Sequence, residues 1–197
     1  SRAADWAVRH HPVFGSENTA RRTSDVIYTG FYFETLGTAL ATPSGKEEKD
    51  WVASKIKGLA VEGMALGATG GTTLLLNQAI RRTSPDLSTN NSFPSGHASM
   101  GFSNATLSNR NLDSISMPNE VRVPIQVGNV ALAALMSWAR VEGGLHYPTD
   151  VLVGAALGHF LSAFIHDAFM GLPEEKDFAI SVAPQRGGIA GQVFFTF

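Results

Sequence analysis

Apolar and polar residues follow each other along most of this chain with the period of α-helices. Apolar positions three and four residues apart predict six helical segments. The segment over 46–57 is charged and amphipathic, and the segment over 58–80 is markedly apolar. The six segments cover residues 24–41, 46–57, 58–80, 97–111, 121–139 and 148–169. The first is expected to be capped by Ser24 or Asp25. The pattern predicts an all-α protein, a helical bundle of about five or six helices.

The two ends of the chain have a different pattern. Residues 1–22 are polar and basic and predict an N-terminal arm. Apolar and polar residues alternate over 178–182 and again over 189–197, with a Pro/Gly turn at 184–188, which predicts a short C-terminal β-hairpin packed on the helices. The 197 residues suffice for one compact unit, so we expect a single domain over residues 1–197.

Glycines recur every fourth residue in the most apolar segment, at Gly63, Gly67 and Gly71. This spacing predicts a smooth helix face that a neighbouring helix approaches closely, an arrangement found both in membranes and in tightly packed soluble bundles. Each long apolar run is interrupted by charged or amide side chains, as by Glu62, and the mean hydropathy of the chain is near zero. A membrane span needs about 20 apolar residues with few charges, so we expect a soluble protein that can still associate with a membrane surface.

Charge and cysteine content narrow the possible partners. The net charge of −2 argues against a general nucleic-acid-binding protein. The chain contains no cysteine, which excludes disulfides and thiolate metal sites and is compatible with a bacterial periplasm. No signal peptide stands at the start of the sequence, and we expect a periplasmic or membrane-associated bacterial protein. Nothing in the pattern predicts the oligomeric state.

The first candidate for chemistry is the stretch Pro94-Ser95-Gly96-His97, directly before a predicted helix. Pro94 favours a turn, and Gly96 lets the backbone approach a ligand. Ser95 offers a hydroxyl, and His97 lies at a helix N-terminus, where free N–H groups and the helix dipole attract anions. This stretch predicts an anion-binding turn with an acid–base side chain.

A second stretch follows some forty residues later and supplies Arg140, His146 and Asp150. Pro148 suits the first turn of a helix, which places Asp150 where it can reach back to orient His146 and fix its tautomer. Two histidines, an arginine, an oriented carboxylate and helix N-terminal amides together predict a site for phosphate or vanadate.

With these residues the sequence resembles the type 2 phosphatidic acid phosphatase superfamily, which also contains bacterial class A acid phosphatases and vanadium haloperoxidases. The family signature reads Lys-x6-Arg-Pro, then Pro-Ser-Gly-His, then Ser-Arg-x5-His-x3-Asp. Its second part is intact at 94–97 and its third at 140–150, with Ala139 in place of the serine. The first part departs, because Asn77 and Ser84 stand at the Lys and Arg positions and Arg82 is the nearest remaining cation.

The resemblance implies a two-step hydrolysis of phosphomonoesters that needs no metal. His146 is then the nucleophile that forms a phosphohistidine, Asp150 holds its ring, and His97 protonates the leaving group. Residues of the signature are also implied to bind the phosphate. They are Arg140, Ser95 and Gly96, with Arg82 as a substitute cation and Asn77 and Ser84 at the degenerate positions.

Three functions follow as hypotheses. The first is a phosphatase for lipid phosphates or small phosphate esters, with activity reduced by the degenerate first motif. The second is a non-catalytic phosphate-binding or interaction module. The third is a vanadium-dependent haloperoxidase. Asn77 and Ser84 argue against it, because the haloperoxidases of the family use the Lys and both Arg of the signature to bind vanadate. No cofactor is expected for the first, although vanadate or phosphate can occupy such a site.

Overall fold

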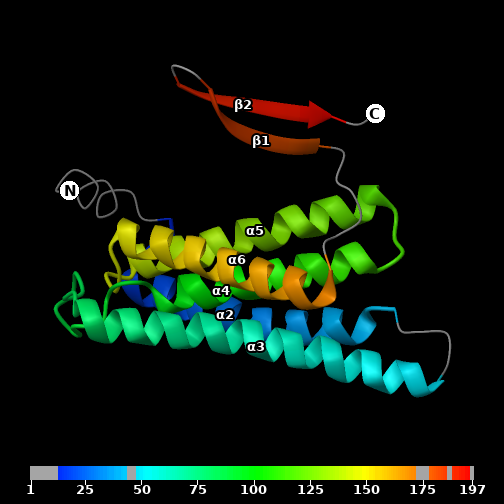
Figure 1. Cartoon of the computed structure of the whole chain (residues 1–197). Helices are drawn as coiled ribbons and strands as arrows, with labels where there is room; N and C mark the ends of the chain where they lie inside the picture. The colour runs from blue at the N-terminus through cyan, green and yellow to red at the C-terminus, as the bar shows by residue number, and fades with distance from the viewer. Residues whose placement is uncertain (1–12, 44–47, 172–177, 186–187, 196–197) are drawn as a thin grey trace.

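The fold is a bundle of five α-helices, seen in a computed structural model that describes residues 13–43, 48–171, 178–185 and 188–195. The helices are named in the order of the chain (Figure 1). They are α2 (Glu17–Ala41), α3 (Glu48–Ile80), α4 (Gly96–Ser114), α5 (Asn119–Glu142) and α6 (Pro148–Met170). The all-α prediction is therefore confirmed for the helical body, with five helices in the described part.

Two helix boundaries differ from the prediction. Helix α2 begins at Glu17 rather than residue 24, because Ser16 caps it by accepting the Thr19 N–H. Ser24 and Asp25 therefore lie inside the helix and are not caps. The two segments predicted over 46–57 and 58–80 are a single helix, α3.

Helix α4 is the centre of the bundle and contacts each of the other four helices. Its buried face is polar, which is unusual for a central helix. The buried polar residues of this helix are Ser99, Ser103, Asn104, Thr106, Ser108 and Asn111. All of them except Ser99 bond to polar groups on the surrounding helices, as when Thr35 Oγ1 donates to Asn104 Oδ1 at 2.8 Å. Hydrogen bonding of this kind removes most of the cost of burying polar groups.

Helix α6 packs against α4 through two glycines. A Cβ atom at Gly158 would lie 1.9 Å from the Ser99 carbonyl oxygen, and one at Gly154 would lie 2.7 Å from the Ser95 carbonyl oxygen. The predicted close approach at Gly63, Gly67 and Gly71 of α3 is wrong, because a Cβ there would meet no atom within 4 Å among the described residues.

The outer surface of the bundle is rich in large apolar side chains. Those at least 60 % exposed are Val13, Val26, Phe33, Ile56, Leu75, Leu87, Val127, Leu152, Phe160 and Phe164. Two helical segments, Trp51–Ile80 and Pro148–Met170, are long and apolar enough to cross a bilayer. A polar centre inside an apolar outer surface is the reverse of the usual soluble arrangement and is compatible with membrane association.

The predicted C-terminal hairpin corresponds to the segments labelled β1 (Phe178–Gln185) and β2 (Gly188–Phe195) in Figure 1. Among the described residues, neither strand contacts a helix, so the predicted packing of a hairpin on the bundle is not seen. An isolated two-stranded hairpin is marginally stable in water, and the hairpin stays a prediction. Most of the predicted arm, residues 1–12, lies outside the described residues.

Candidate active site

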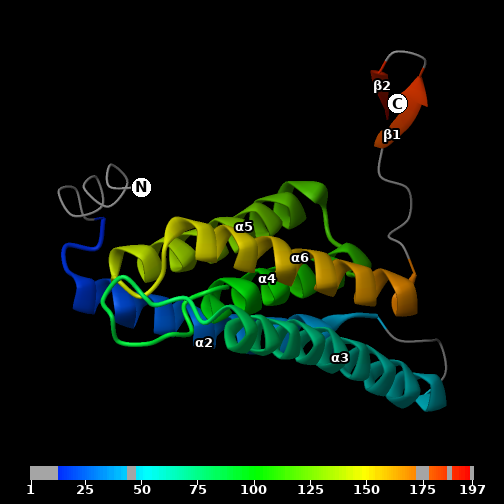
Figure 2. The ribbon, with the colours of Figure 1, turned by 60° about the vertical axis from the view of Figure 1, so that its left-hand side comes forward.

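The residues of the two intact motifs meet at one end of the bundle. The connection between α3 and α4, the first turn of α4, the α5–α6 connection and the N-terminal half of α2 all lie at this end (Figure 2). The Ser95 N–H donates to the Asp150 carbonyl oxygen at 3.0 Å, which joins the start of α4 directly to the start of α6. Residues some fifty positions apart in the sequence therefore belong to one site.

His146 is held with one ring nitrogen engaged and the other available. Its Nδ1 lies 2.8 Å from the Ser92 carbonyl oxygen, and the residue is only 9 % exposed. A carbonyl oxygen can only accept a hydrogen bond, so Nδ1 carries the proton in this contact. The neutral ring then has its lone pair on Nε2, the form that a nitrogen nucleophile requires. The sequence had predicted that Asp150 fixes this tautomer, whereas the structure has the Ser92 carbonyl oxygen at Nδ1.

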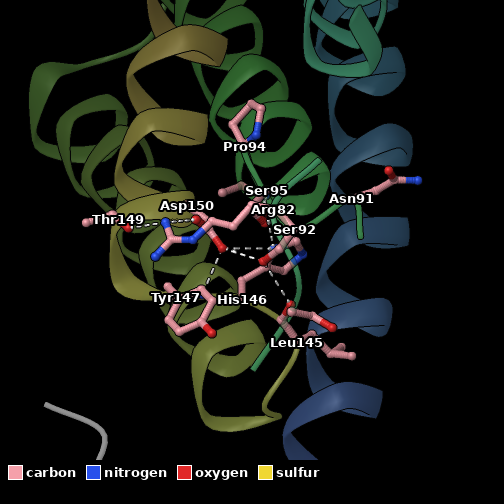
Figure 3. Close-up of polar contacts among 12 residues, drawn as sticks. Arg82, Asn91, Ser92, Pro94, Ser95, Leu145, His146, Tyr147, Thr149 and Asp150 are labelled. Atoms are coloured by element: carbon pink, nitrogen blue, oxygen red, sulfur yellow. Dashed lines mark hydrogen bonds and ion pairs between the residues drawn. The ribbon is translucent and has the colours of Figure 1, made fainter. Parts of the chain in front are cut away.

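Asp150 instead anchors the chain around His146. The side chain is fully buried and accepts hydrogen bonds from Ser92 Oγ, from the Tyr147 N–H at 2.9 Å and from Arg82 Nη1 at 2.7 Å (Figure 3). Its Oδ2 lies 3.8 Å from His146 Nδ1, too far for a hydrogen bond but near enough to stabilise a positive charge on the ring.

Arg82 is the partner of Asp150. Its Nη1 also donates to Thr149 Oγ1 at 2.8 Å, and its guanidinium lies 4.1 Å from the centre of the Tyr147 ring. The family signature had predicted Arg82 as a substitute cation for the phosphate. The contacts of its guanidinium are with the residues that fix His146, because the nearest buried carboxylate attracts it.

The two degenerate positions of the first motif take part in holding the loop. Asn77 Nδ2 donates to the Pro94 carbonyl oxygen at 2.9 Å. Ser84 is fully buried, and its hydroxyl donates to Asp86 Oδ1 at 2.7 Å. That bond, with a second from Ser88, lowers the pKa of the Asp86 carboxyl. Both positions are therefore neutral hydrogen-bond donors that bind protein atoms.

Ser95 and Gly96 begin α4. The Ser95 hydroxyl is fully buried and accepts the Ala98 N–H at 3.4 Å as the helix N-cap. Ser95 thus shapes the turn, while the first backbone N–H groups of α4, from Gly96 onward, lie at the positive end of the helix dipole. The amides are the better candidates for contact with an anion at this turn.

Arg140 and His97 meet at a side chain that the motifs do not include. Arg140 Nη1 donates to Asp25 Oδ1 and to Ser24 Oγ, each at 3.1 Å, and His97 Nε2 lies 3.0 Å from the same Asp25 oxygen. Arg140 Nε is buried without a hydrogen-bond partner among the described residues. Arg140 therefore keeps hydrogen-bonding capacity that the described residues do not use.

The pKa of the His97 ring is lowered to about 4, first by burial and then by the positive charge of Arg140. The hydrogen bond and negative charge of Asp25 act in the opposite direction, and the nearby His146 lowers the pKa slightly further. His97 is therefore mostly neutral near pH 7 in the absence of an anion. A bound phosphate dianion would raise its pKa for the same electrostatic reason.

The site residues missed from the sequence are Ser92, Asp25 and Tyr28. The Tyr28 ring packs on the His97 ring with 4.4 Å between their centres. The spacing of three residues between Asp25 and Tyr28 indicates that both lie on one face of a helix. The local sequence does not show which part of the protein that face contacts. No group of three or more metal-binding side chains occurs among the described residues.

Comparison with known protein families gives one match. The sequence model of the PAP2 superfamily matches residues 34–172, which include both intact motifs. A comparison with curated proteins and with solved structures finds no significant match.

Proposed function

The chain belongs to the PAP2 superfamily, and from this premise we propose that it is a phosphomonoesterase that acts on a lipid phosphate through a phosphohistidine. The observation that carries the proposal is the fixed ring of His146. Its Nδ1–H is held by the Ser92 carbonyl oxygen, which leaves Nε2 as a nucleophile. Arg140 and His146 both lie close enough to His97 to lower the pKa of its ring. Superfamily membership itself supports phosphatase activity in the broad sense.

In the first step His146 Nε2 attacks the phosphorus atom of the ester. The bond between phosphorus and the alcohol oxygen breaks as the N–P bond forms, and the protonated His97 gives its proton to the departing oxygen. The alcohol leaves, and the phosphoryl group stays on His146. Asp150 Oδ2, 3.8 Å from Nδ1, stabilises the positive charge that the ring acquires.

In the second step His97, now neutral, takes a proton from water. The water oxygen attacks phosphorus, the N–P bond breaks, and orthophosphate leaves with His146 restored. Arg140 and the first amides of α4 are the donors available for the charge on the phosphoryl oxygens. This scheme uses protein cations for charge stabilisation and proceeds without a metal.

Turnover is expected to be slower than in relatives with an intact first motif. Asn77 and Ser84 are neutral, and they bind the Pro94 carbonyl and Asp86. Of the three cations in the family signature, Arg140 alone is present at its position, and the nearby Arg82 is held by Asp150. Loss of one donor to a developing oxyanion typically costs about 3–4 kcal/mol, a rate factor of roughly a hundred to a thousand.

The arrangement of polar and apolar side chains supports a lipid substrate. The polar face of α4 is enclosed by other helices, and the outward faces of α3, α5 and α6 carry apolar side chains along their length. A bilayer satisfies such a surface, whereas water does not. We place the bundle in the bilayer, with the site at the end that reaches the lipid headgroups.

The proposal is tested by phosphate release from the purified protein in mixed micelles, with EDTA present, from phosphatidate, phosphatidylglycerol phosphate, a polyprenyl phosphate and soluble monoesters. We expect release from a lipid substrate, and its loss by more than a thousandfold in His146→Gln. A matched control is His166→Gln, a buried histidine near the far end of α6. Labelling of the protein by a phosphate-labelled substrate would detect the phosphohistidine. We expect a label that acid removes, that alkali does not remove, and that is absent from His146→Gln. Release abolished by EDTA, or kept in His146→Gln, contradicts the mechanism.

A second function has one observation in its favour. Because Asn77 and Ser84 are neutral and engaged with the loop, the chain can be a phosphate-binding module that no longer turns substrate over. Orthophosphate binding that depends on Arg140, together with no release from any of the substrates above, would support this function in place of the first.

A further inference from the structure

Helix α2 forms one wall of the site, although no signature residue lies on it. Arg21, Ser24, Asp25 and Tyr28 are spaced as i, i+3, i+4 and i+7, which places them on one face of the helix. Arg21 Nε donates to the Gly143 carbonyl oxygen at 2.7 Å, which ties this face to the α5–α6 connection. The position of α2 against the site is therefore fixed by polar contacts at several successive turns.

Asp25 is the member of this face that reaches both motifs. A single oxygen, Oδ1, lies 3.0 Å from His97 Nε2 and 3.1 Å from Arg140 Nη1. An ionised carboxylate only accepts hydrogen bonds, so His97 Nε2 carries a proton in this contact. The second proton of a charged His97 ring is then on Nδ1, the nitrogen turned away from Asp25.

We propose that Asp25 is a positioning residue for the acid–base work of His97. Asp25 and the packed Tyr28 ring hold His97 so that Nδ1 delivers the proton to the leaving oxygen and later takes one from water. The inference rests on the proposed phosphatase function. A carboxylate that orients a histidine and stabilises its charged form is a recurring device in acid–base catalysis.

The charges that face His97 make this carboxylate necessary. Arg140 from α5 and His146 from the α5–α6 connection both disfavour the protonated ring, and burial does so more strongly. Asp25 from α2 is the group that favours it, and Tyr28 from the same helix contacts the ring face. Without Asp25, a smaller fraction of His97 would carry the proton that the leaving group needs.

The contact also permits a different role, in which Asp25 occupies Arg140 and competes with phosphate. Positioning is favoured because Arg140 keeps a buried donor, Nε, that is not bonded to Asp25 or to any other described residue. Ser24 bonds Arg140 Nη1 as well, so the arginine is held from the α2 side with Nε left over. Asp25 therefore occupies only the Nη1 donor of Arg140 and leaves the rest of the guanidinium unengaged by its carboxylate.

The test compares Asp25→Asn and Asp25→Glu with Glu17→Gln, an exposed carboxylate two turns earlier on the same helix. His97 ring titration is followed by NMR in micelles, alongside the pH dependence of kcat. For Asp25→Asn we expect the His97 pKa to fall by about one unit and kcat to fall about tenfold, with KM changed less than about twofold. Asp25→Glu is expected to restore part of the loss, and Glu17→Gln to match the wild type.

An unchanged His97 titration and pH profile in Asp25→Asn, together with tighter inhibition by orthophosphate, would overturn the positioning role in favour of competition. If the wild type releases phosphate from no substrate, the proposed function fails separately. The NMR titration then still decides the inference, since a shift in Asp25→Asn supports the contact with His97 and no shift overturns it.

Discussion

At the scale of single residues, the cation nearest to the degenerate motif, Arg82, is paired with a buried carboxylate. Arg82 stabilises Asp150, which is fully buried, while the Arg82 side chain is 37 % exposed. A buried carboxylate without its partner is costly. The charge of Arg82 therefore serves His146 through the residues that hold it.

The first prediction concerns Arg82→Ala. We expect a loss of about 1–2 kcal/mol in the free energy of unfolding, below the 3–5 kcal/mol of a fully buried pair because solvent screens the exposed guanidinium. Turnover should fall about tenfold as the His146 loop loosens. Thermal unfolding in detergent and the phosphatase assay measure the two effects. Arg81→Ala, an exposed neighbour, is the control, and equal behaviour of the two variants would refute the role.

The second prediction concerns the two positions of the lost cations. Asn77→Lys keeps a donor for the Pro94 carbonyl and adds a charge, so we expect turnover to rise at least about tenfold. Ser84→Arg forces a long side chain into a fully buried position and should destabilise the fold by about 1–3 kcal/mol. Kinetics and thermal unfolding of the two single variants separate these effects. Unchanged kinetics in Asn77→Lys would show that position 77 lies beyond reach of the phosphate.

At the scale of elements, the sequence predicted which segments are helical, but it did not predict which helices lie next to each other. Pro148 and the turn before Gly96 determine where α6 and α4 begin, and the sequence predicted both. The start of α2 was missed because Ser16 caps it ahead of a basic stretch that resembles an arm. Asp25 was missed as a site residue because its partner His97 is 72 positions away, a contact that only tertiary packing creates.

The third prediction tests the α4–α6 contact. Gly158→Ala places a methyl group against the Ser99 carbonyl, so the helices must separate and Ser95 and Asp150 must shift relative to each other. We expect a loss of about 1–3 kcal/mol in stability and a fall in turnover. Gly67→Ala is the matched control, because a methyl group there meets no described atom and helix propensity favours alanine by about 1 kcal/mol. Equal destabilisation of both variants would contradict the packing argument.

At the scale of the whole molecule, two of the charged side chains that interrupt the apolar runs point inward. Glu62 of α3 is 6 % exposed and accepts a hydrogen bond from Asn111 Nδ2 at 2.7 Å. Asp167 of α6 pairs with Arg110 Nη2 at 2.7 Å. Polar side chains that face the interior of a bundle are compatible with a bilayer outside. From the sequence alone, charged residues in the apolar runs argue against membrane-spanning helices. Their inward direction was not predictable because tertiary packing determines it.

The last prediction compares two phenylalanines on the outer face of α6. Phe160 lies near the middle of the helix and is 64 % exposed, whereas Phe169 lies near its end and is 52 % exposed. In a bilayer, arginine at the middle costs about 2.5–3.5 kcal/mol, whereas arginine at the end reaches the headgroups at little cost. We therefore expect Phe160→Arg to reduce the membrane-integrated, carbonate-resistant fraction strongly and Phe169→Arg to leave it nearly unchanged. In a water-exposed bundle both changes would instead raise the yield without detergent, and that result would exclude the bilayer.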